Sequence, residues 1–474
     1  MKELGSVTRF KVIFRCLIAY SSTVRLLVRL LRQSYSQAST PAGPGPWSVR
    51  PESISSLQGY SIDHHSISQT VVACLNDDFF VIAVHLVRLL SDQDSRKEFL
   101  AFRDADAQVL LDLLQILLDH DKFLAIKSVL FDALCRLSDN SGLHPTCFAL
   151  TELRKIGHQV AAGGFGDVWK GVVREQSVCV KVMRLFQDSD VQVVLKEFGR
   201  EALIWRQLWH PNLLPFYGVY HLENRLCIVS PWMENGNILQ YVNKNSPGID
   251  RRLSWMLDVA QGVAYLHKNR IVHGDLKALN VLVTPSQRAC IVDFGLASLA
   301  ESVALLFTYS STGVRGGTAR YQAPELLKAE KANHSGSDVY AFAHVCYEIL
   351  TGKVPFFKLT NDAAVIVKVF EGAIPERLPS CMGTPVLDHL WSLLQECWTR
   401  NLTERPCAEE LVQRLIGPSI QAANSQCETD WDPRSSSRFR RALEPVDSFV
   451  PVPSVARMEQ ILFGDGAYSL AIHL

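Results

Sequence analysis

Hydrophobic residues recur every three or four positions in three segments of the N-terminal part of the chain. The segments 77–90, 106–118 and 121–137 each place apolar side chains on one face of a helix. Three such amphipathic segments in succession predict a small bundle of antiparallel helices over residues 61–140. This region has no cluster of histidine, cysteine or acidic residues whose pattern indicates a chemical site. We therefore interpret it as a packing module, with recruitment of a protein partner as the alternative.

A fourth helical pattern lies nearer the N-terminus and differs in charge. Its apolar residues recur every seven positions from Phe10 to Leu31, and residues 4–51 contain seven basic residues and no acidic ones. A basic amphipathic leader over residues 1–32 is typical of an organelle-targeting peptide, or of contact between residues 9–32 and an anionic membrane surface. The alternatives are a helix docked on the neighbouring domain and a stretch without fixed structure. We expect a cytoplasmic protein, with organelle targeting by this leader left open.

The segments on either side of the helical module have different patterns. Residues 33–60 are rich in serine, proline and glycine, which favours a linker. Residues 150–417 then begin with alternating positions: Val168, Lys170 and Val172 are followed by VREQSVCVKV, which predicts a strand, a turn and a strand. After that domain, residues 418–474 favour a flexible tail.

A glycine-rich segment lies at the start of the first hairpin. Residues 161–168 have the sequence AAGGFGDV, in which Gly163, Gly164 and Gly166 leave backbone N–H groups free to approach phosphate oxygens. A dinucleotide-binding loop would lead into a helix. Here a hairpin follows instead, which is the context of the glycine-rich loop of protein kinases.

Lys181 lies within an apolar strand, where a charged group is unfavourable unless it is paired. Nucleotide phosphates and a carboxylate on the following helix are suitable partners. Glu197 and Glu201 are the candidates, and they lie one helical turn apart on the same face. We favour Glu201, which lies ten residues before Pro211 of a His-Pro-Asn sequence.

The strongest chemical signal is the sequence HGDLKALN at residues 273–280, followed by Asp-Phe-Gly starting at Asp293. Phosphoryl transfer needs little covalent help but much electrostatic positioning. Asp275 can accept the proton of the attacking hydroxyl, and Lys277 can neutralise charge on the transferred group. Asn280 and Asp293 supply hard oxygen ligands for Mg²⁺.

With Ala-Pro-Glu at residues 323–325, five motifs follow one another in the order found in protein kinases, which residues 150–417 resemble. The resemblance implies an α+β fold with a small β-rich lobe and a large helical lobe, preceded here by the helical module. ATP would bind between the lobes. Lys277, and Thr318 with its potential hydrogen bonds to Asp275 and Lys277, indicate a serine/threonine kinase. The His-Pro-Asn segment, the Met-Glu-Asn-Gly hinge and Cys397-Trp398 resemble the tyrosine-kinase-like group, fungal members in particular.

The resemblance also implies roles for residues outside the main motifs. Glu325 and Arg405 would form a structural ion pair, and Asp338 would support the catalytic loop from a buried helix. Ser230 would gate the back pocket, while the backbone of Pro231 and Met233 would bind adenine. The remaining implied ATP-binding residues are Ala161, Gly163, Gly164, Phe165, Gly166, Val168, Cys179, Lys181 and Leu282.

Two positions depart from the family pattern. Ala161 replaces the first glycine of the loop, which should alter loop mobility more than ATP binding. Gly274 replaces the arginine that usually pairs with a phosphorylated activation-segment residue. We therefore expect phosphate on residues 308–312 to matter less than in arginine-containing relatives. The alternative is that another basic residue, such as Arg315, anchors it.

Composition excludes several other classes of protein. The 474 residues have a formal net charge of zero, with 47% apolar and 20% charged residues, which argues against a disordered chain and a basic nucleic-acid binder. The twelve cysteines form no CxxC pair, so we expect buried free thiols and no zinc site. No uncharged apolar run reaches the ~18 residues of a membrane span. A serine/threonine kinase acting on proteins in signalling is the favoured function. The alternatives are a pseudokinase scaffold and a dual-specificity or tyrosine kinase.

Overall fold

The computed structural model describes most of residues 86–416 and two residues of the tail. The described ranges are 86–87, 90–119, 126–146, 150, 153–162, 166–173, 175–183, 191–222, 225–295, 297–299, 319–327, 334–416 and 430–431. They divide between two compact units, one ending at Thr146 and the other beginning at Cys147. The predicted leader, the linker and residues 308–312 lie outside the described residues, so the predictions for them remain predictions.

The first unit contains the helices α3 (Gln93–Leu100), α4 (Asp104–Leu118) and α5 (Lys127–Ser141). Helix α4 turns a row of leucines inward at every third or fourth position, and four of them, including Leu111 and Leu114, are fully or almost fully buried. Helix α5 packs against α4 and is capped by Gly142, whose φ of 72° is the left-handed conformation that glycine adopts readily. The small all-α module predicted before the main domain is therefore confirmed.

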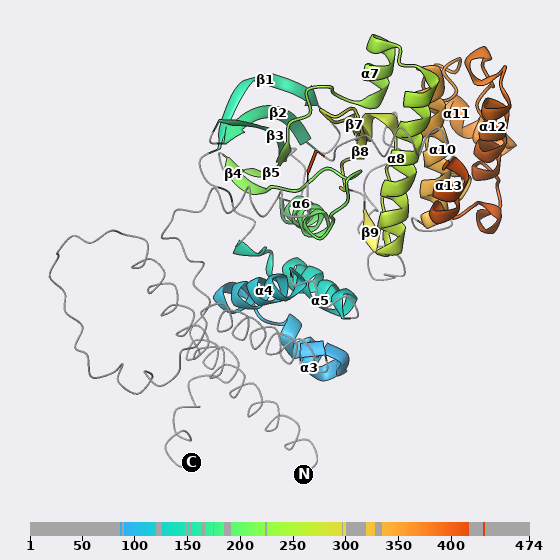
Figure 1. The fold of residues 1–474 in the computed structure, drawn as a ribbon. Helices are drawn as coiled ribbons and strands as arrows, with labels where there is room; N and C mark the ends of the chain where they lie inside the picture. Colours follow the sequence, from blue (N-terminus) through green and yellow to red (C-terminus); the bar gives the residue numbers. More distant parts are fainter. Residues whose placement is uncertain are drawn as a thin grey trace, which may run out of the picture. The chain divides into compact units, whose positions relative to one another are not determined.

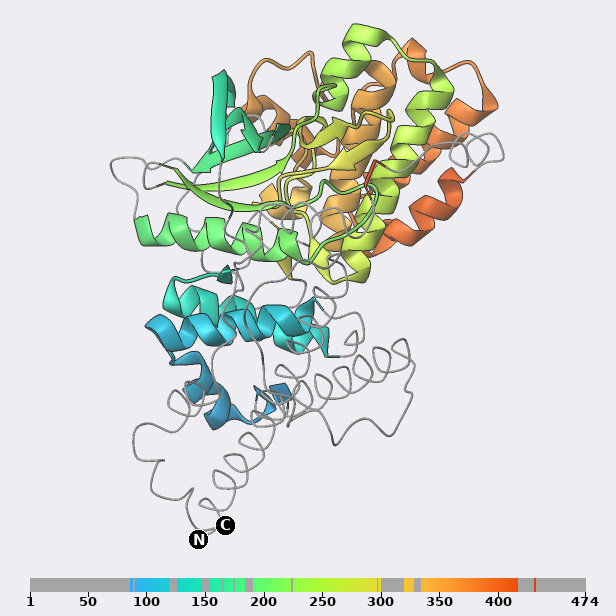
Figure 2. The same ribbon diagram turned by 60° about the vertical axis from the view of Figure 1, so that its left-hand side comes forward.

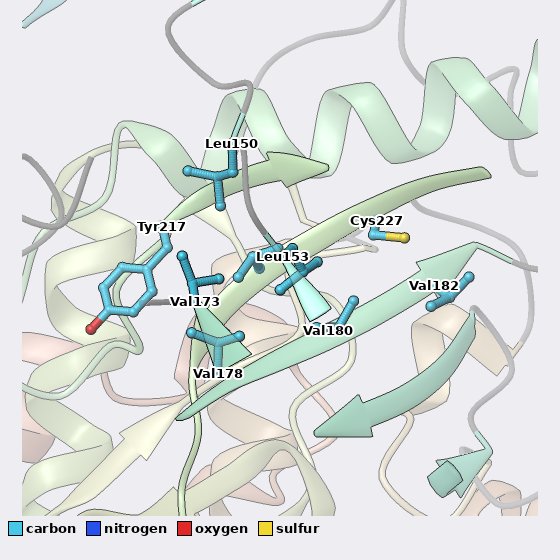
Figure 3. Packing of buried hydrophobic residues seen from close by; sticks show 9 residues of the cluster. Leu150, Leu153, Val173, Val178, Val180, Val182, Tyr217 and Cys227 are labelled. Atoms are coloured by element: carbon cyan, nitrogen blue, oxygen red, sulfur yellow. The ribbon is translucent and has the colours of Figure 1, made fainter. Parts of the chain in front are cut away.

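The second unit begins with a five-stranded antiparallel sheet in the order β1-β2-β3-β5-β4 (Figures 1 and 2). Side chains alternate along β3, so that Val178, Val180 and Val182 are buried while Cys179 and Lys181 face the other side. Figure 3 shows the valines packed in a cluster with Leu153 and other apolar residues. The strands are β1 (Arg154–Ala162), β2 (Gly166–Val173), β3 (Gln176–Met183), β4 (Gly218–Leu222) and β5 (Arg225–Pro231).

Helix α6 (Val191–Arg206) covers the sheet and contacts β4 and β5. The larger lobe that follows is helical, and α8 packs against α10, α13 and β8 at its centre. Its helices are α7 (Ile238–Asn245), α8 (Ile249–Lys268), α9 (Pro324–Leu327), α10 (Ser335–Thr351), α11 (Asp362–Glu371), α12 (Pro385–Cys397) and α13 (Ala408–Leu415), with single turns η4 (Ala278–Asn280), η6 (Pro379–Cys381) and η7 (Leu402–Glu404).

Two short two-stranded sheets flank the catalytic motifs. Strand β6 (Ile271–Val272) pairs with β9 (Ser298–Leu299), and β7 (Val281–Val283) pairs with β8 (Ala289–Ile291). The predicted two-lobed α+β fold is confirmed. Among the described residues, no helix combines the length and hydrophobicity needed to cross a bilayer.

Candidate active site

Lys181 is the centre of a three-residue charge cluster. Its Nζ atom donates to Glu201 Oε1 at 2.8 Å and to Asp293 Oδ1 at 2.7 Å. Burial acts to lower the pKa of the ammonium group, but Asp293 and Glu201 outweigh it and hold that pKa above its usual value. Lys181 is therefore charged. The structure places Glu201, the residue favoured on sequence, in contact with it, while the side chain of Glu197 lies outside the description.

Asp293 reaches the cluster through an unusual backbone conformation. Its φ is 69°, in the left-handed region that non-glycine residues rarely adopt and that is often found at functional sites. The next residue, Phe294, is fully buried. Its ring centroid lies 5.4 Å from that of Trp205 on α6 and 5.5 Å from that of His273 in the catalytic loop. Phe294 thus links the helix that bears Glu201 to the loop that bears Asp275.

Asp275 lies in the catalytic loop with one oxygen engaged and one open. Its Oδ2 accepts from Lys277 Nζ at 2.6 Å and from Asn280 Nδ2 at 3.2 Å. Asn280 Nδ2 also donates to the Asp275 backbone carbonyl at 2.9 Å, which fixes the two residues relative to each other. The other oxygen, Oδ1, is buried and accepts no hydrogen bond from the described part of the chain. A buried carboxylate oxygen without a donor is suited to accept one from a substrate hydroxyl.

Helix α10 holds the catalytic loop through hydrogen bonds to Asp338. One carboxylate oxygen accepts from the backbone N–H of Gly274 at 2.9 Å, and the other accepts from that of His273 at 2.8 Å. His267 Nε2 lies 2.9 Å from the second oxygen. Burial acts to raise the pKa of Asp338, but these hydrogen bonds outweigh it and lower that pKa. Gly274 itself has a φ of 77°, a conformation that favours glycine.

A second carboxyl group on α10 also contacts the catalytic loop. Glu348 is fully buried, and its Oε1 accepts from the backbone N–H of Ala278 at 3.3 Å. Burial raises the pKa of Glu348 to about 8, and the hydrogen bonds with the Ala278 backbone and the Tyr321 side chain offset only part of that rise. The role of Glu348 was not predicted from the sequence. The available signal was an acidic residue within an otherwise apolar helical run.

The Ala-Pro-Glu segment is anchored by a bidentate ion pair. Arg405 Nη1 and Nη2 donate to the two Glu325 oxygens at 2.7 and 2.9 Å, and Arg405 Nη1 also donates to the Gly336 carbonyl at 2.8 Å. Ser337 Oγ donates to Glu325 at 2.9 Å. This is the pair that the resemblance implies, and it ties the short helix α9 to the start of α10.

The residues expected to contact ATP are placed by the sheet and by β7. Val168 lies opposite Lys181, and Cys179 lies opposite Ser230, in neighbouring antiparallel strands. Pro231 ends β5 and Met233 follows in the hinge. Leu282 on β7 pairs with Asn237, just after the hinge. Ala161 and Gly166 lie in β1 and β2. Gly163, Gly164, Phe165 and Thr318 lie outside the described residues.

The fold and the arrangement of this site define a protein kinase. Residues 154–415 match the family model for protein tyrosine and serine/threonine kinases, and this chain belongs to that family.

Three protein kinases illustrate the similarity to known proteins. The serine/threonine-protein kinase STY46 of Arabidopsis thaliana is 32% identical over 264 residues, which are 55% of this chain and 43% of STY46. The serine/threonine/tyrosine-protein kinase HT1 of the same plant is 30% identical over 55% of this chain and 65% of its own. The dual specificity protein kinase shkC of Dictyostelium discoideum is 34% identical over 56% and 51%.

These relatives confirm the predicted assignment to the tyrosine-kinase-like group, while the resemblance to fungal members stays a prediction. The match covers less than half the length of STY46, and its 264 residues are about as many as the 154–415 range that matches the family model.

Proposed function

We propose that residues 150–417 transfer the γ-phosphate of ATP to serine and threonine hydroxyls of protein substrates, with Mg²⁺ as the metal ion, in a signalling role. The observation that carries this proposal is the state of Asp275. Lys277 and Asn280 fix one of its oxygens, and the other is buried and open to a donor. A scaffold that only binds partners has no need of such a carboxylate.

The side chains around the site fit a hard divalent cation. Asn280 uses its amide nitrogen on Asp275, which leaves the amide oxygen as a ligand. One Asp293 oxygen, Oδ1, accepts a hydrogen bond from Lys181, and the other oxygen, Oδ2, is the candidate metal ligand. Two such oxygen donors suit Mg²⁺, which keeps several waters and phosphate oxygens as its remaining ligands. When bound, the metal ion would neutralise charge on the phosphates.

The protein side chains then divide the remaining work. The substrate hydroxyl oxygen attacks the γ-phosphorus, the bond from that phosphorus to the bridging oxygen breaks to release ADP, and Asp275 Oδ1 accepts the hydroxyl proton. Lys277, 2.6 Å from Asp275 Oδ2, offsets negative charge on the transferred group. Lys181 orients the phosphates of ATP and is itself oriented by Glu201. The names of HT1 and shkC include tyrosine or dual specificity, so tyrosine transfer is a second candidate activity.

The proposal is tested by phosphate transfer from labelled ATP to a generic protein substrate. We expect Asp275→Asn to lower the rate by about 10²- to 10⁴-fold, because it removes the proton acceptor. Asp250→Asn is the matched control, since Asp250 is exposed at the start of α8. Phosphoamino-acid analysis of the product separates serine and threonine from tyrosine transfer. Equal incorporation by wild type and Asp275→Asn, with either Mg²⁺ or Mn²⁺, would favour the scaffold.

A further inference from the structure

Two residues of the tail contact the kinase domain well outside the active site. Asp430 accepts hydrogen bonds from the Ser286 backbone N–H at 3.0 Å and from the Ser286 hydroxyl at 2.5 Å. Trp431 is 7% exposed, and its indole N–H donates to the His210 carbonyl at 3.3 Å. We infer that Asp430 and Trp431 form a tail clip, an intramolecular docking element that stabilises the active arrangement of the kinase domain.

The two ends of the tail clip bind different structural elements. Ser286 lies in the tight turn between β7 and β8, and His210 lies in the segment between α6 and β4. The polar residue therefore engages one segment while the adjacent aromatic residue engages another. A buried tryptophan whose N–H has an acceptor is the type of side chain that anchors an interface. Trp431 therefore anchors the clip by burial, and the Asp430 hydrogen bonds fix its orientation.

The segment under Trp431 is itself firmly bonded to β8. His210 Nδ1 accepts from the Asn212 backbone N–H at 3.1 Å, and the His210 ring lies 5.0 Å from that of Tyr265 on α8. Asn212 Nδ2 donates to the Ala289 carbonyl at 3.0 Å, and the Asn212 carbonyl accepts from the Ile291 N–H at 2.9 Å. Both residues of the clip thus bear on the hairpin of β7 and β8, Asp430 directly and Trp431 through residues 210–212.

This junction is close in sequence to both acidic partners of Lys181, since residues 210–212 follow Glu201 and β8 precedes Asp293. Strand β8 ends at Ile291, two residues before Asp293, and α6 carries Glu201 and ends four residues before His210. Loosening the junction would let the two carboxylates move relative to each other. Asp430 and Trp431 are therefore positioning residues, and they act on Lys181 through α6 and β8 without touching it.

Amide hydrogen exchange of the full-length chain tests docking without reference to catalysis. We expect Trp431→Ala to speed exchange at residues 209–214 and 289–291 by about tenfold. Val386→Ala, which alters an exposed apolar side chain on α12, should leave those amides unchanged. Unchanged exchange in a folded Trp431→Ala protein would overturn the tail clip.

A double-mutant cycle on Asp430 and Ser286 provides the second test, and it remains usable if Trp431→Ala does not fold. Asp430→Ala and Ser286→Ala should each speed exchange of these amides. The double variant should differ from Asp430→Ala by less than the Ser286→Ala effect alone, because the two side chains share a hydrogen bond. Strict additivity would show that the two side chains do not interact.

The effect on catalysis rests on the proposed kinase function. We expect Trp431→Ala to reduce phosphate transfer by about 3- to 10-fold, the size of effect typical of residues that act through packing. An increase in the rate would overturn the stabilising role even if docking were observed. A wild-type protein without transfer activity would reject the kinase proposal, and the exchange measurements would still decide whether the clip docks.

Discussion

The catalytic loop and the Lys181 cluster are both built around buried carboxylates, but they are held in different ways. Asp338 on α10 accepts from two consecutive backbone N–H groups of the catalytic loop. Because these donors belong to the main chain, the two hydrogen bonds anchor the backbone of the loop directly to α10. The Lys181 cluster instead joins three side chains from different segments. Lys181 on β3 contacts Glu201 on α6, 20 residues away in the sequence, and Asp293 after β8, 112 residues away.

The difference shows where activity can be controlled. A shift of α6 or of the segment after β8 would separate Glu201 or Asp293 from Lys181, yet it would leave Asp275 and Asn280 in place. The catalytic loop therefore supplies the chemistry, and the Lys181 cluster reports whether the surrounding elements are correctly packed. Substitutions in the two regions should consequently differ in their effects on stability and on activity.

Asp338→Asn should have the largest effect, because it changes a carboxylate that organises the catalytic loop. An amide offers one oxygen and turns an N–H₂ group towards backbone donors, which leaves buried groups unpaired. We expect a loss of about 3–5 kcal/mol in the free energy of unfolding and a severe loss of activity. Chemical denaturation compared with the exposed-site variant Asp250→Asn measures the first effect. An unfolding midpoint like that of the wild type would contradict the interpretation that Asp338 holds the catalytic loop in place.

Glu201→Gln should lower activity with little change in stability. Glutamine still accepts a hydrogen bond from Lys181, which also keeps its contact with Asp293. Without the negative charge on residue 201, Lys181 is held less firmly towards the phosphates, and we expect the rate to decrease about 10- to 100-fold, which is about 1.4–2.7 kcal/mol in activation free energy. Steady-state kinetics and thermal unfolding of the same preparation provide the two measurements. Glu409→Gln, at an exposed position of α13, is the control. Equal losses of stability here and in Asp338→Asn would remove the distinction between the two regions.

Glu348→Gln should have the smallest effect, seen as a change in pH dependence. Burial raises the pKa of Glu348 from 4.5 to about 8, so the folded protein binds this proton more tightly than the unfolded chain. Between these values a rise in pH destabilises the folded protein through this group, by at most about 1.4 kcal/mol per pH unit. Glutamine stays neutral, and the variant should lose this part of the slope. Unfolding free energies measured from pH 6 to 8 test this, and identical slopes would show that Glu348 does not titrate in this range.

Sequence reasoning reached the reacting groups because they lie in local patterns. Asp275, Lys277 and Asn280 lie within six residues, and the alternation along β3 places Lys181 on the face opposite the buried valines. The choice between Glu197 and Glu201 was harder, because residues one helical turn apart share a face. The distance from Lys181 to Glu201 places that residue in the cluster.

The features that sequence reasoning missed depend on contacts between distant segments. Glu348 meets Ala278 from 70 residues away, and Trp431 meets His210 from 221 residues away. No spacing rule connects such positions, since their meeting depends on how helices and turns pack. The tail was predicted to be flexible as a whole, and the structure shows two of its residues bound to the kinase domain.

Gly274 has a consequence that concerns the unfolded chain. With a φ of 77°, it occupies a conformation that would strain an arginine but suits glycine. Glycine also has the greatest conformational freedom before folding, so ordering it costs more entropy than ordering any other residue. The hydrogen bond from Gly274 to Asp338 therefore causes no backbone strain in the folded state. Its cost is the conformational entropy that Gly274 has in the unfolded chain and loses on folding. The stability of the catalytic loop in this kinase therefore depends on the unfolded state as well as on the folded one.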